Sequence, residues 1–408
     1  MKAAKYIWLT WRGWVILSSA LLWFLISLVN QTLFAFLLAS FAASLSIVSF
    51  ISALFSLHGI EVRRAPSGDA SVGQVISLPL EIVNLRRRRR QDLIIQERLF
   101  CTPERLSLHI LPPLPRKGKT VLDRRVLAVH RGEFKLDEVI LRGGDPAGLF
   151  FRERKFSLPA PLLVYPPVLP VSDLFLHKYE ASPTSTGQPI STAGTSQDFY
   201  GVREYHINDA MRYIHWRSSA RYGKLMVKEF ERNAVTAVAI LIDAQEQFVS
   251  KTLLSNLEYQ VQAAASIAAH CAGLYCSLSF AAGGSRLRLI QPKSAAAARQ
   301  DILYNLAALK PGNVALLPAM NALLPMLGKN TVVFCLSLSE SPALRRALDS
   351  LLQSGMDVRW CLAPRQSFSL TREKDKKTLD SGLKSILKPV HVTPETNLEQ
   401  ALNQALCI

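Results

Sequence analysis

One long apolar run near the N-terminus constrains this chain more than any other feature of its sequence. Residues 13–57 are almost unbroken apolar sequence, and only Asn30-Gln31 interrupts them strongly. Splitting the run at this pair gives segments 11–29 and 32–55, each about long enough for the ~20 residues of a membrane-spanning helix. A signal peptide has a shorter apolar core of ~7–15 residues. We therefore predict a transmembrane helical hairpin over residues 1–60, rather than a buried hairpin of a soluble core.

Basic residues flank this hairpin on both sides, while its tip carries no charge. Lys2, Lys5 and Arg12 precede it, and Arg63 and Arg64 follow it. Because positively charged flanks stay in the cytoplasm, we predict that both ends of the hairpin and the soluble part of the chain are cytoplasmic.

The pattern changes after the hairpin, and the 408 residues suggest two or three domains. In residues 61–170, short apolar runs alternate with Pro, Gly and charged clusters, which predicts an antiparallel β-sandwich. We expect its strands in the runs 75–83, 93–100, 120–129, 134–141 and 162–165. Residues 171–200 are rich in Ser, Thr, Pro and Gly, which is typical of a linker.

Residues 201–408 become strictly alternating after Ala234. The predicted strands are 235–243, 276–281, 286–290, 331–336, 358–362 and 390–392, and the predicted helices are 257–272, 295–309, 314–327, 342–352 and 397–406. Strands alternating with helices indicate a doubly wound α/β sheet. The predicted fold class is therefore α+β multidomain: a transmembrane hairpin, an antiparallel β-sandwich and a doubly wound α/β domain.

Residues 196–232 concentrate basic and aromatic side chains, and are too aromatic for a solvated linker and too charged for a core strand. Their pattern predicts a strand, a turn, a short helix, a second turn at 222–224 and a strand at 225–230. Asn208 is expected to cap the helix. Asp209 then lies in the first turn, where the helix dipole favours an anion.

This stretch resembles the signature of bacterial membrane-anchored proteins that carry the domain of unknown function 58 and are associated with MoxR-type AAA+ ATPases. The matching positions are Arg203, Tyr205, Asp209, Arg212, Ile214, Trp216, Ser219, Ala220, Arg221, Gly223, Leu225, Val227 and Glu229. One position differs, because Asn208 stands where the family has Gly. Residues 130–151 resemble a second signature, with Ala147 in place of Phe. Its turn at Asp145-Pro146 is either a docking edge or simple turn chemistry.

The resemblance implies a von Willebrand factor A-like α/β domain and a place in the bacterial inner (cytoplasmic) membrane. It also implies a non-catalytic adaptor or scaffold, a partner of a MoxR-type AAA+ ATPase and other membrane proteins in the assembly or maturation of protein complexes. The candidate binding residues are Arg203, Tyr205, Asp209, Arg212, His215, Trp216, Ser219, Arg221, Gly223 and Glu229.

Two hypotheses remain for these motif residues. We predict that Arg203, Asp209, Arg212, Trp216 and Arg221 form one partly buried network, because unpaired buried charge is costly. The alternative is an enzyme, hydrolase-like, that uses Tyr205, Asp209 and His215. Since no Gly-rich phosphate loop, nucleophile elbow or HExxH motif lies nearby, we favour the adaptor.

A metal or cofactor is not expected. Related von Willebrand A-type domains often bind Mg²⁺ through D-x-S-x-S, but here Asp243 is followed by Ala-Gln-Glu-Gln, without either serine. A hard cation needs several oxygen ligands, so Asp243 is a weak metal candidate. The six cysteines form no C-x-x-C pair, and neither a zinc site nor a disulfide framework is indicated.

The net charge of +17 favours an anionic neighbour, such as a membrane surface or nucleic acid. Five consecutive arginines, Arg86, Arg87, Arg88, Arg89 and Arg90, lie between two predicted strands. They are either a solvated hairpin loop or a contact with anionic lipid at the inner leaflet. The run lacks interleaved aromatic residues, so no specific nucleic acid is expected.

Overall fold

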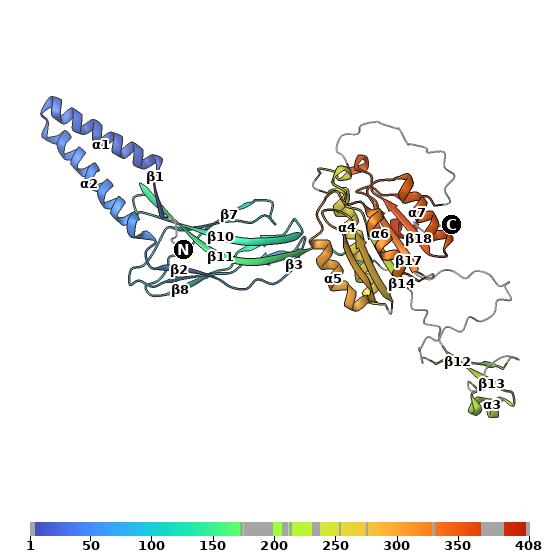
Figure 1. Cartoon of the computed structure of the whole chain (residues 1–408). Coiled ribbons are helices and arrows are strands. Elements are labelled where there is room, and N and C mark those ends of the chain that lie inside the picture. The colour runs from blue at the N-terminus through green and yellow to red at the C-terminus, as the bar shows by residue number, and fades with distance from the viewer. Residues whose placement is uncertain are drawn as a thin grey trace. The chain divides into compact units, whose positions relative to one another are not determined.

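The computed structural model describes residues 5–171, 174, 199–205, 211, 214–230, 237–252, 254–274, 276–328, 331–368 and 387–404 (Figure 1). The chain divides into two compact units, Met1–Leu169 with Leu303–Lys310, and Pro170–Ile302 with Pro311–Ile408. The predicted linker, residues 171–200, lies almost entirely outside the described residues.

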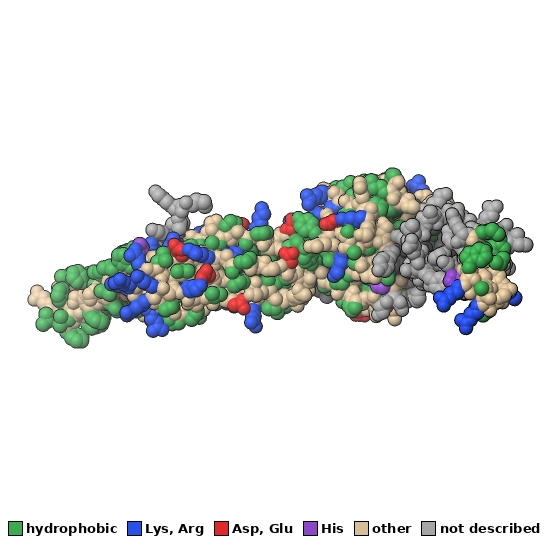
Figure 2. Space-filling model, turned by 90° about the horizontal axis from the view of Figure 1, so that it is seen from below, with side chains coloured by type: hydrophobic (Ala, Val, Ile, Leu, Met, Phe, Trp, Pro, Cys, Tyr) green, Lys and Arg blue, Asp and Glu red, His purple; other side chains and the backbone are tan. Residues whose placement is uncertain are grey.

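Two long apolar helices form the N-terminal hairpin, as predicted: α1 (Trp11–Asn30) and α2 (Leu33–Ser56). The Thr10 side chain caps α1 by accepting the Gly13 N–H at 3.1 Å, and Gln31 turns the chain with φ 49°. The buried side chains of both helices are small, so that the large apolar side chains face outward, as the green surface of Figure 2 shows. Both helices are long and apolar enough to cross a membrane.

The hairpin is attached to the following sheets at the start of α1 and at the end of α2. The short strand β1 (Lys5–Leu9) pairs with β11 (Phe150–Tyr165), and the Thr10 N–H donates to the Leu149 carbonyl at 2.9 Å. At the other helix, the Arg152 guanidinium donates to the Leu54 carbonyl. The base of the hairpin is therefore held by backbone groups of the sandwich.

Two sheets form the sandwich. One has the order β1-β11-β10-β6-β7 with β3 beside β11, the other has the order β2-β5-β8, and β4 pairs with β9. Apart from the parallel pair β3–β11, these pairings are antiparallel. Their bounds are β2 (Ile60–Arg64), β3 (Ala70–Ser71), β4 (Val75–Ser77), β5 (Leu80–Asn84), β6 (Leu93–Arg98), β7 (Leu106–Ile110), β8 (Lys119–Leu122), β9 (Arg125–Leu127) and β10 (Gly132–Gly144).

Side chains from both sheets meet in the sandwich core. Val62 and Ile82 of one sheet pack in the same buried cluster as Ile95, Val139 and Leu141 of the other. Each of these strands points every second side chain inward, as the alternating pattern predicts.

Several predicted strands of this region were wrong in extent. The runs 75–83 and 120–129 are each split into two strands, and 162–165 is only the end of the 16-residue β11. Strand β7 was not predicted, because its residues are all exposed or half-buried at the edge of the sheet and show no inward apolar face.

The second unit holds a six-stranded sheet in the order β16-β15-β14-β17-β18-β19. Its strands are β14 (Ala237–Ile242), β15 (Ser277–Ala282), β16 (Arg288–Ser294), β17 (Thr331–Ser337), β18 (Asp357–Leu362) and β19 (Val390–His391). All neighbours are parallel except β15 and β16. Its helices are α4 (Asn256–Ala272), α5 (Ala295–Ala307), α6 (Leu316–Leu323), α7 (Pro342–Gln353) and α8 (Leu398–Gln404).

The alternation of strands and helices is confirmed in this unit. Ala239, Val333 and Trp360 face one buried cluster together with side chains of α6 and α7, whereas α4 contacts β14 and β17. The predicted helix 314–327 is shorter than expected, since α6 ends at Leu323 and a 3-10 turn follows (Leu324–Met326). The five described cysteines are buried and form no disulfide.

Candidate functional site

The motif stretch folds as two antiparallel strands with a short helix, as the strand–helix–strand prediction required. β12 (Phe199–Glu204) pairs with β13 (Met226–Phe230), and α3 (Trp216–Tyr222) lies between them in the chain. The helix α3 begins at Trp216, and its cap is His215. The predicted helix start, with Asn208 as cap and Asp209 in the first turn, lies outside the described residues.

His215 builds this local structure with its ring and its backbone. Its Nδ1 atom caps the first turn of α3 by accepting the Ser218 N–H at 3.2 Å. The same atom lies 2.7 Å from the Ser218 hydroxyl. Its backbone N–H donates to the Met226 carbonyl at 2.8 Å. Because the cap occupies Nδ1, this nitrogen is not free to act as a base in the alternative Tyr205, Asp209 and His215 cluster.

Ser219 and Gly223 complete the link between α3 and β13. The Ser219 hydroxyl accepts the Met226 N–H at 2.9 Å and donates to the His215 carbonyl at 3.1 Å. Gly223 ends the helix with φ 65°, a left-handed conformation that L side chains adopt only with strain. A small buried contact lies beneath, where Ile214 forms a β-bridge with Val227. These motif residues join α3 to β13.

Tyr205 is half-buried, and its N–H donates to the Leu225 carbonyl at 2.9 Å. Trp216 and Arg221, by contrast, point into solvent. Trp216 is 68% exposed and Tyr222 62% exposed, and no residue of α3 is buried. Arg217, Arg221 and Lys224 are exposed as well. The predicted buried network is therefore wrong for Trp216 and Arg221, while the side chains of Arg203, Asp209, Arg212 and Glu229 lie outside the described ones.

We call Trp216, Arg217, Arg221, Tyr222 and Lys224 the motif face. Arg217 and Arg221 are one helical turn apart and so lie on the same side of α3. Lys224 forms an exposed ion pair with Glu204 at 2.6 Å, and the hydrogen bond to this carboxylate raises the pKa of Lys224. Trp, Tyr and Arg are the residues that most often carry the binding energy of protein interfaces. Chemically, the motif face can bind an acidic protein surface.

Asp243 occupies the end of β14, where a metal ligand was considered. Its carboxylate accepts the Gln245 N–H at 3.2 Å. Burial raises the pKa of Asp243, although backbone N–H groups of Gln245, Leu338 and Ala244 oppose this rise. No group of three His, Cys, Asp or Glu side chains suited to a metal occurs in the described part of the chain. Asp243 thus fits the role of a cap that fixes the following loops.

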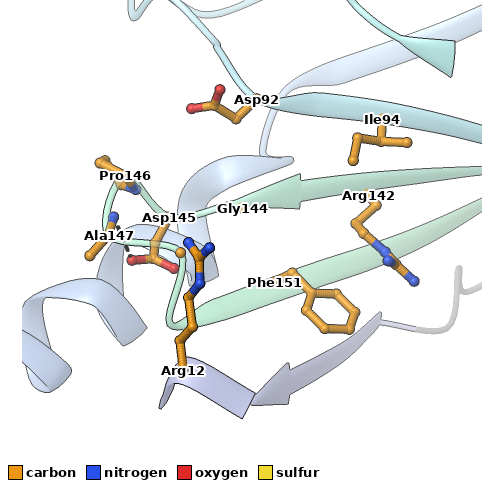
Figure 3. Close-up of a pocket in the computed structure, with 10 residues that line it drawn as sticks. Arg12, Asp92, Ile94, Arg142, Gly144, Asp145, Pro146, Ala147 and Phe151 are labelled. Carbon is orange, nitrogen blue, oxygen red and sulfur yellow. Dashed lines mark hydrogen bonds between the residues drawn. The ribbon is translucent and has the colours of Figure 1, made fainter. Parts of the chain in front are cut away.

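An open pocket of about 360 Å³ lies beside the turn at Asp145, near the start of α1 (Figure 3). Asp145 is buried, and its carboxylate accepts the N–H groups of Ala147 at 3.0 Å and Phe150 at 2.7 Å. Arg142 lines the pocket but is paired with Glu153 at 2.6 Å and stacks on Phe151. These contacts favour simple turn chemistry over a docking edge for the second signature, because the Asp145 carboxylate accepts hydrogen bonds from the turn itself.

Comparisons with known proteins locate the family resemblance in the second unit. Residues 201–354 match the family model described as "Protein of unknown function DUF58". The "Uncharacterized protein YeaD" of Bacillus subtilis (strain 168) is 28% identical over 184 residues, which cover 42% of this chain and 46% of that protein. The match therefore spans about half the length of this relative.

Two solved structures share only limited similarity with this chain. A late embryogenesis abundant (LEA) protein has a TM-score of 0.20 at 17% identity, covering 31% of this chain and 84% of its own. The Pseudomonas fluorescens alkylpurine DNA glycosylase AlkC, bound to DNA with an abasic site analog, has a TM-score of 0.16 at 13% identity, covering 35% of this chain and 42% of its own. TM-scores this low do not indicate a shared fold or function.

Proposed function

We propose that this protein is a non-catalytic adaptor of the bacterial inner membrane, anchored by α1 and α2, whose motif face binds a protein partner. The observation that carries this proposal is the exposure of Trp216 within a stretch whose local fold is held by His215 and Ser219. A large aromatic side chain that is exposed on a helix with two exposed arginines is typical of a residue that anchors a protein interface.

The resemblance to membrane-anchored proteins of the domain of unknown function 58 suggests the class of partner. We propose a MoxR-type AAA+ ATPase, with other membrane proteins as clients in the assembly or maturation of complexes. Arg217, Arg221 and Lys224 would favour an acidic patch on this partner, because complementary charge steers association. The strand order and the antiparallel edge strand β16 are compatible with the von Willebrand factor A-like architecture that we propose for the α/β sheet.

The orientation of the anchor follows from its charges. Arg12 lies in the first turn of α1 and Arg63 follows α2, so that both soluble units would lie in the cytoplasm. A reporter fused after Ile408 should be active only if it functions in the cytoplasm. Activity of a periplasm-specific reporter at this position would contradict the proposed topology.

Partner binding is tested by a crosslinked pull-down from membranes, with and without ATP, followed by mass spectrometry. Trp216→Ala with Arg217→Ser should lower capture of the ATPase at least about tenfold, since interface anchors contribute ~2 kcal/mol or more each. The matched control is Leu287→Ala with Arg286→Ser, which removes an exposed apolar side chain and an exposed arginine elsewhere in the second unit. Equal capture by both double variants would refute the motif face as the docking surface.

A further inference from the structure

The five-arginine loop lies directly against the end of α2. The Leu85 N–H donates to the Gly59 carbonyl at 2.9 Å. The Arg86 guanidinium lies 2.5 Å from the His58 ring nitrogen Nε2, and Arg90 donates to the His58 carbonyl at 3.1 Å. The loop is thus fastened two to three residues beyond the last residue of the helix.

Gly59 shows how closely the loop approaches the chain that leaves α2. It has φ 74°, and a side chain at this position would meet the Cγ atom of Arg86 at 2.5 Å. The aliphatic stem of Arg86 therefore crosses the backbone of Gly59 without a gap. The position of the loop beside the helix end is built into the fold.

A buried asparagine fixes the backbone of the loop from within. Asn84 is 0% exposed, and its side-chain amide donates to the carbonyl groups of Arg88 and Pro115, both at 2.9 Å. Its oxygen accepts the Arg86 N–H at 3.1 Å. A buried polar group whose hydrogen bonds are satisfied makes its surroundings rigid, so Asn84 holds the backbone of the loop in one conformation.

Three arginines of the loop point into solvent and form no ion pair with the described residues. Arg87, Arg88 and Arg89 are exposed, and within the described part of the chain no ion pair is formed by them. Arg116 and Lys117 are exposed beside them, because the Lys117 N–H donates to the Arg86 carbonyl. Burial, followed by the charges of Arg88 and Arg86, lowers the pKa of Arg90. The positive charges of this surface therefore repel one another and lack a counter-charge.

Three exposed tryptophans lie at the same end of the hairpin as the five-arginine loop. Trp8, Trp11 and Trp14 surround the start of α1 and are 53%, 75% and 67% exposed. Exposed tryptophans at the end of an apolar helix are typical of the headgroup region of a bilayer. Figure 2 shows basic side chains gathered over the sandwich, next to the apolar hairpin.

We infer that Arg87, Arg88 and Arg89, with Arg116 and Lys117, bind the phosphate groups of anionic phospholipids in the leaflet that adjoins the sandwich. Arg86 and Arg90 have a different task and hold the loop against His58. Guanidinium groups bind phosphate with two parallel hydrogen bonds, which suits arginine better than lysine at this surface. The bound lipids would fix the sandwich against the membrane and select an anionic lipid environment. This inference rests on the membrane insertion of the hairpin that we propose, and is independent of the motif face.

The test uses the full chain reconstituted in bilayers of phosphatidylcholine mixed with phosphatidylglycerol. Brominated forms of each lipid quench the emission of tryptophans at the bilayer, which include Trp8, Trp11, Trp14 and Trp23. The quenching curves give the ratio of the two lipid-binding constants. Arg87→Ser with Arg88→Ser and Arg89→Ser should lower the preference for phosphatidylglycerol by at least about fivefold, the effect of roughly one basic residue at a membrane surface. Higher salt should reduce the preference of the parent protein.

A matched control removes three exposed basic residues at the opposite ends of the same strands, Arg98→Ser with Arg105→Ser and Lys135→Ser. This control should keep the preference of the parent protein, as should the triple Arg→Lys variant of the loop in large part. Equal preferences in the loop and control variants would overturn the lipid surface while leaving the membrane anchor intact. Absence of quenching by either brominated lipid would overturn the anchor and the lipid surface together.

Discussion

The β-sandwich and the motif stretch place their charged residues in opposite ways. In the sandwich, the Glu97 side chain is 1% exposed and lies between two arginines, 2.5 Å from Arg64 and in direct contact with Arg124. In the motif stretch, the described ion pair joins Glu204 and Lys224, whose side chains are 55% and 69% exposed. The motif stretch thus keeps its described charges in solvent, whereas three charges from distant parts of the sequence form the buried network of the sandwich.

The difference follows from the volume that each region can enclose. A helix of seven residues on a two-stranded sheet has almost no interior, and only Ile214 and Val227 are buried there among the described side chains. Two packed sheets enclose a core, and a strand points every second residue into it. Leu93, Ile95 and Glu97 share the inward face of β6, so that Glu97 must find cations inside.

The largest expected effect is that of removing the buried carboxylate. Glu97→Gln leaves Arg64 and Arg124 buried without a counter-charge, and should destabilise the sandwich by roughly 3–5 kcal/mol. Hydrogen exchange of β2 and β6 in the full-length protein in detergent measures this loss locally.

Glu81→Gln is the matched control for that change. Glu81 pairs with Lys119 at 3.2 Å, but the lysine side chain is 72% exposed, and an exposed pair contributes at most about 1 kcal/mol. If the Glu97 and Glu81 variants exchanged equally, the buried triad would contribute nothing special, and the contrast between the two regions would disappear.

A smaller effect is expected where neutral hydrogen bonds replace charges. Ser219→Ala removes the acceptor of the Met226 N–H in a half-buried position, which should destabilise the motif stretch by about 1 kcal/mol. Exchange in residues 214–228 reports the change. Ala220→Ser, at an exposed position of the same helix, is the control and should leave exchange within the experimental error. A Ser219 effect as large as that of Glu97 would show that this stretch has an interior of its own.

A third kind of buried charge is a carboxylate that forms no ion pair with the described residues, and it tests the comparison through pH. Because burial raises the pKa of Asp243 above its ordinary value of 3.8, the folded protein binds this proton more tightly than the unfolded chain. The contribution of Asp243 to the free energy of unfolding therefore increases as the pH falls through its raised pKa, and is lowest at neutral pH. Asp243→Asn lacks this dependence.

The measurement is the melting temperature of the second unit between pH 7 and pH 5, for the parent protein and for Asp243→Asn. The stability of the parent relative to the Asn variant should increase on acidification. A relative decrease would show that Asp243 is stabilised as an anion, as a metal site or a hidden cation would require. Addition of Mg²⁺ should leave the melting temperature of both proteins unchanged, since specific binding would raise it.

How much of this could be predicted from the sequence depended on burial. Every residue of β17 is buried, so its continuous apolar run identified it, and the neighbouring strands and helices of the α/β unit followed in the same way. The hairpin was predictable from its continuous apolar run as well, although its large side chains face outward. Strand β11 was mostly missed, because its 16 residues include charges and prolines and few of its side chains are buried.

The candidate site was less predictable, because local propensities do not determine which residue caps a helix. His215 is not among the residues that most favour a helix cap, yet it caps α3, and its backbone also joins β13. The Glu97 network was missed because Arg64, Glu97 and Arg124 lie far apart in the sequence and only the fold brings them together. The inward register of Leu93 and Ile95 was the available signal for it.

The smallest effect on stability is expected at the motif face. Trp216→Ala with Arg217→Ser changes two exposed side chains, and surface substitutions of this kind alter the free energy of unfolding by at most about 0.5 kcal/mol. Hydrogen exchange in β12, α3 and β13 should therefore match that of the parent, although capture of the ATPase is lost. A variant that loses capture and also exchanges as fast as Ser219→Ala would assign Trp216 to the fold instead of the interface. If hydrogen exchange in the motif stretch is unchanged while capture of the ATPase is lost, the exposed residues of the motif face serve binding, in contrast to the buried charges of the sandwich, which serve stability.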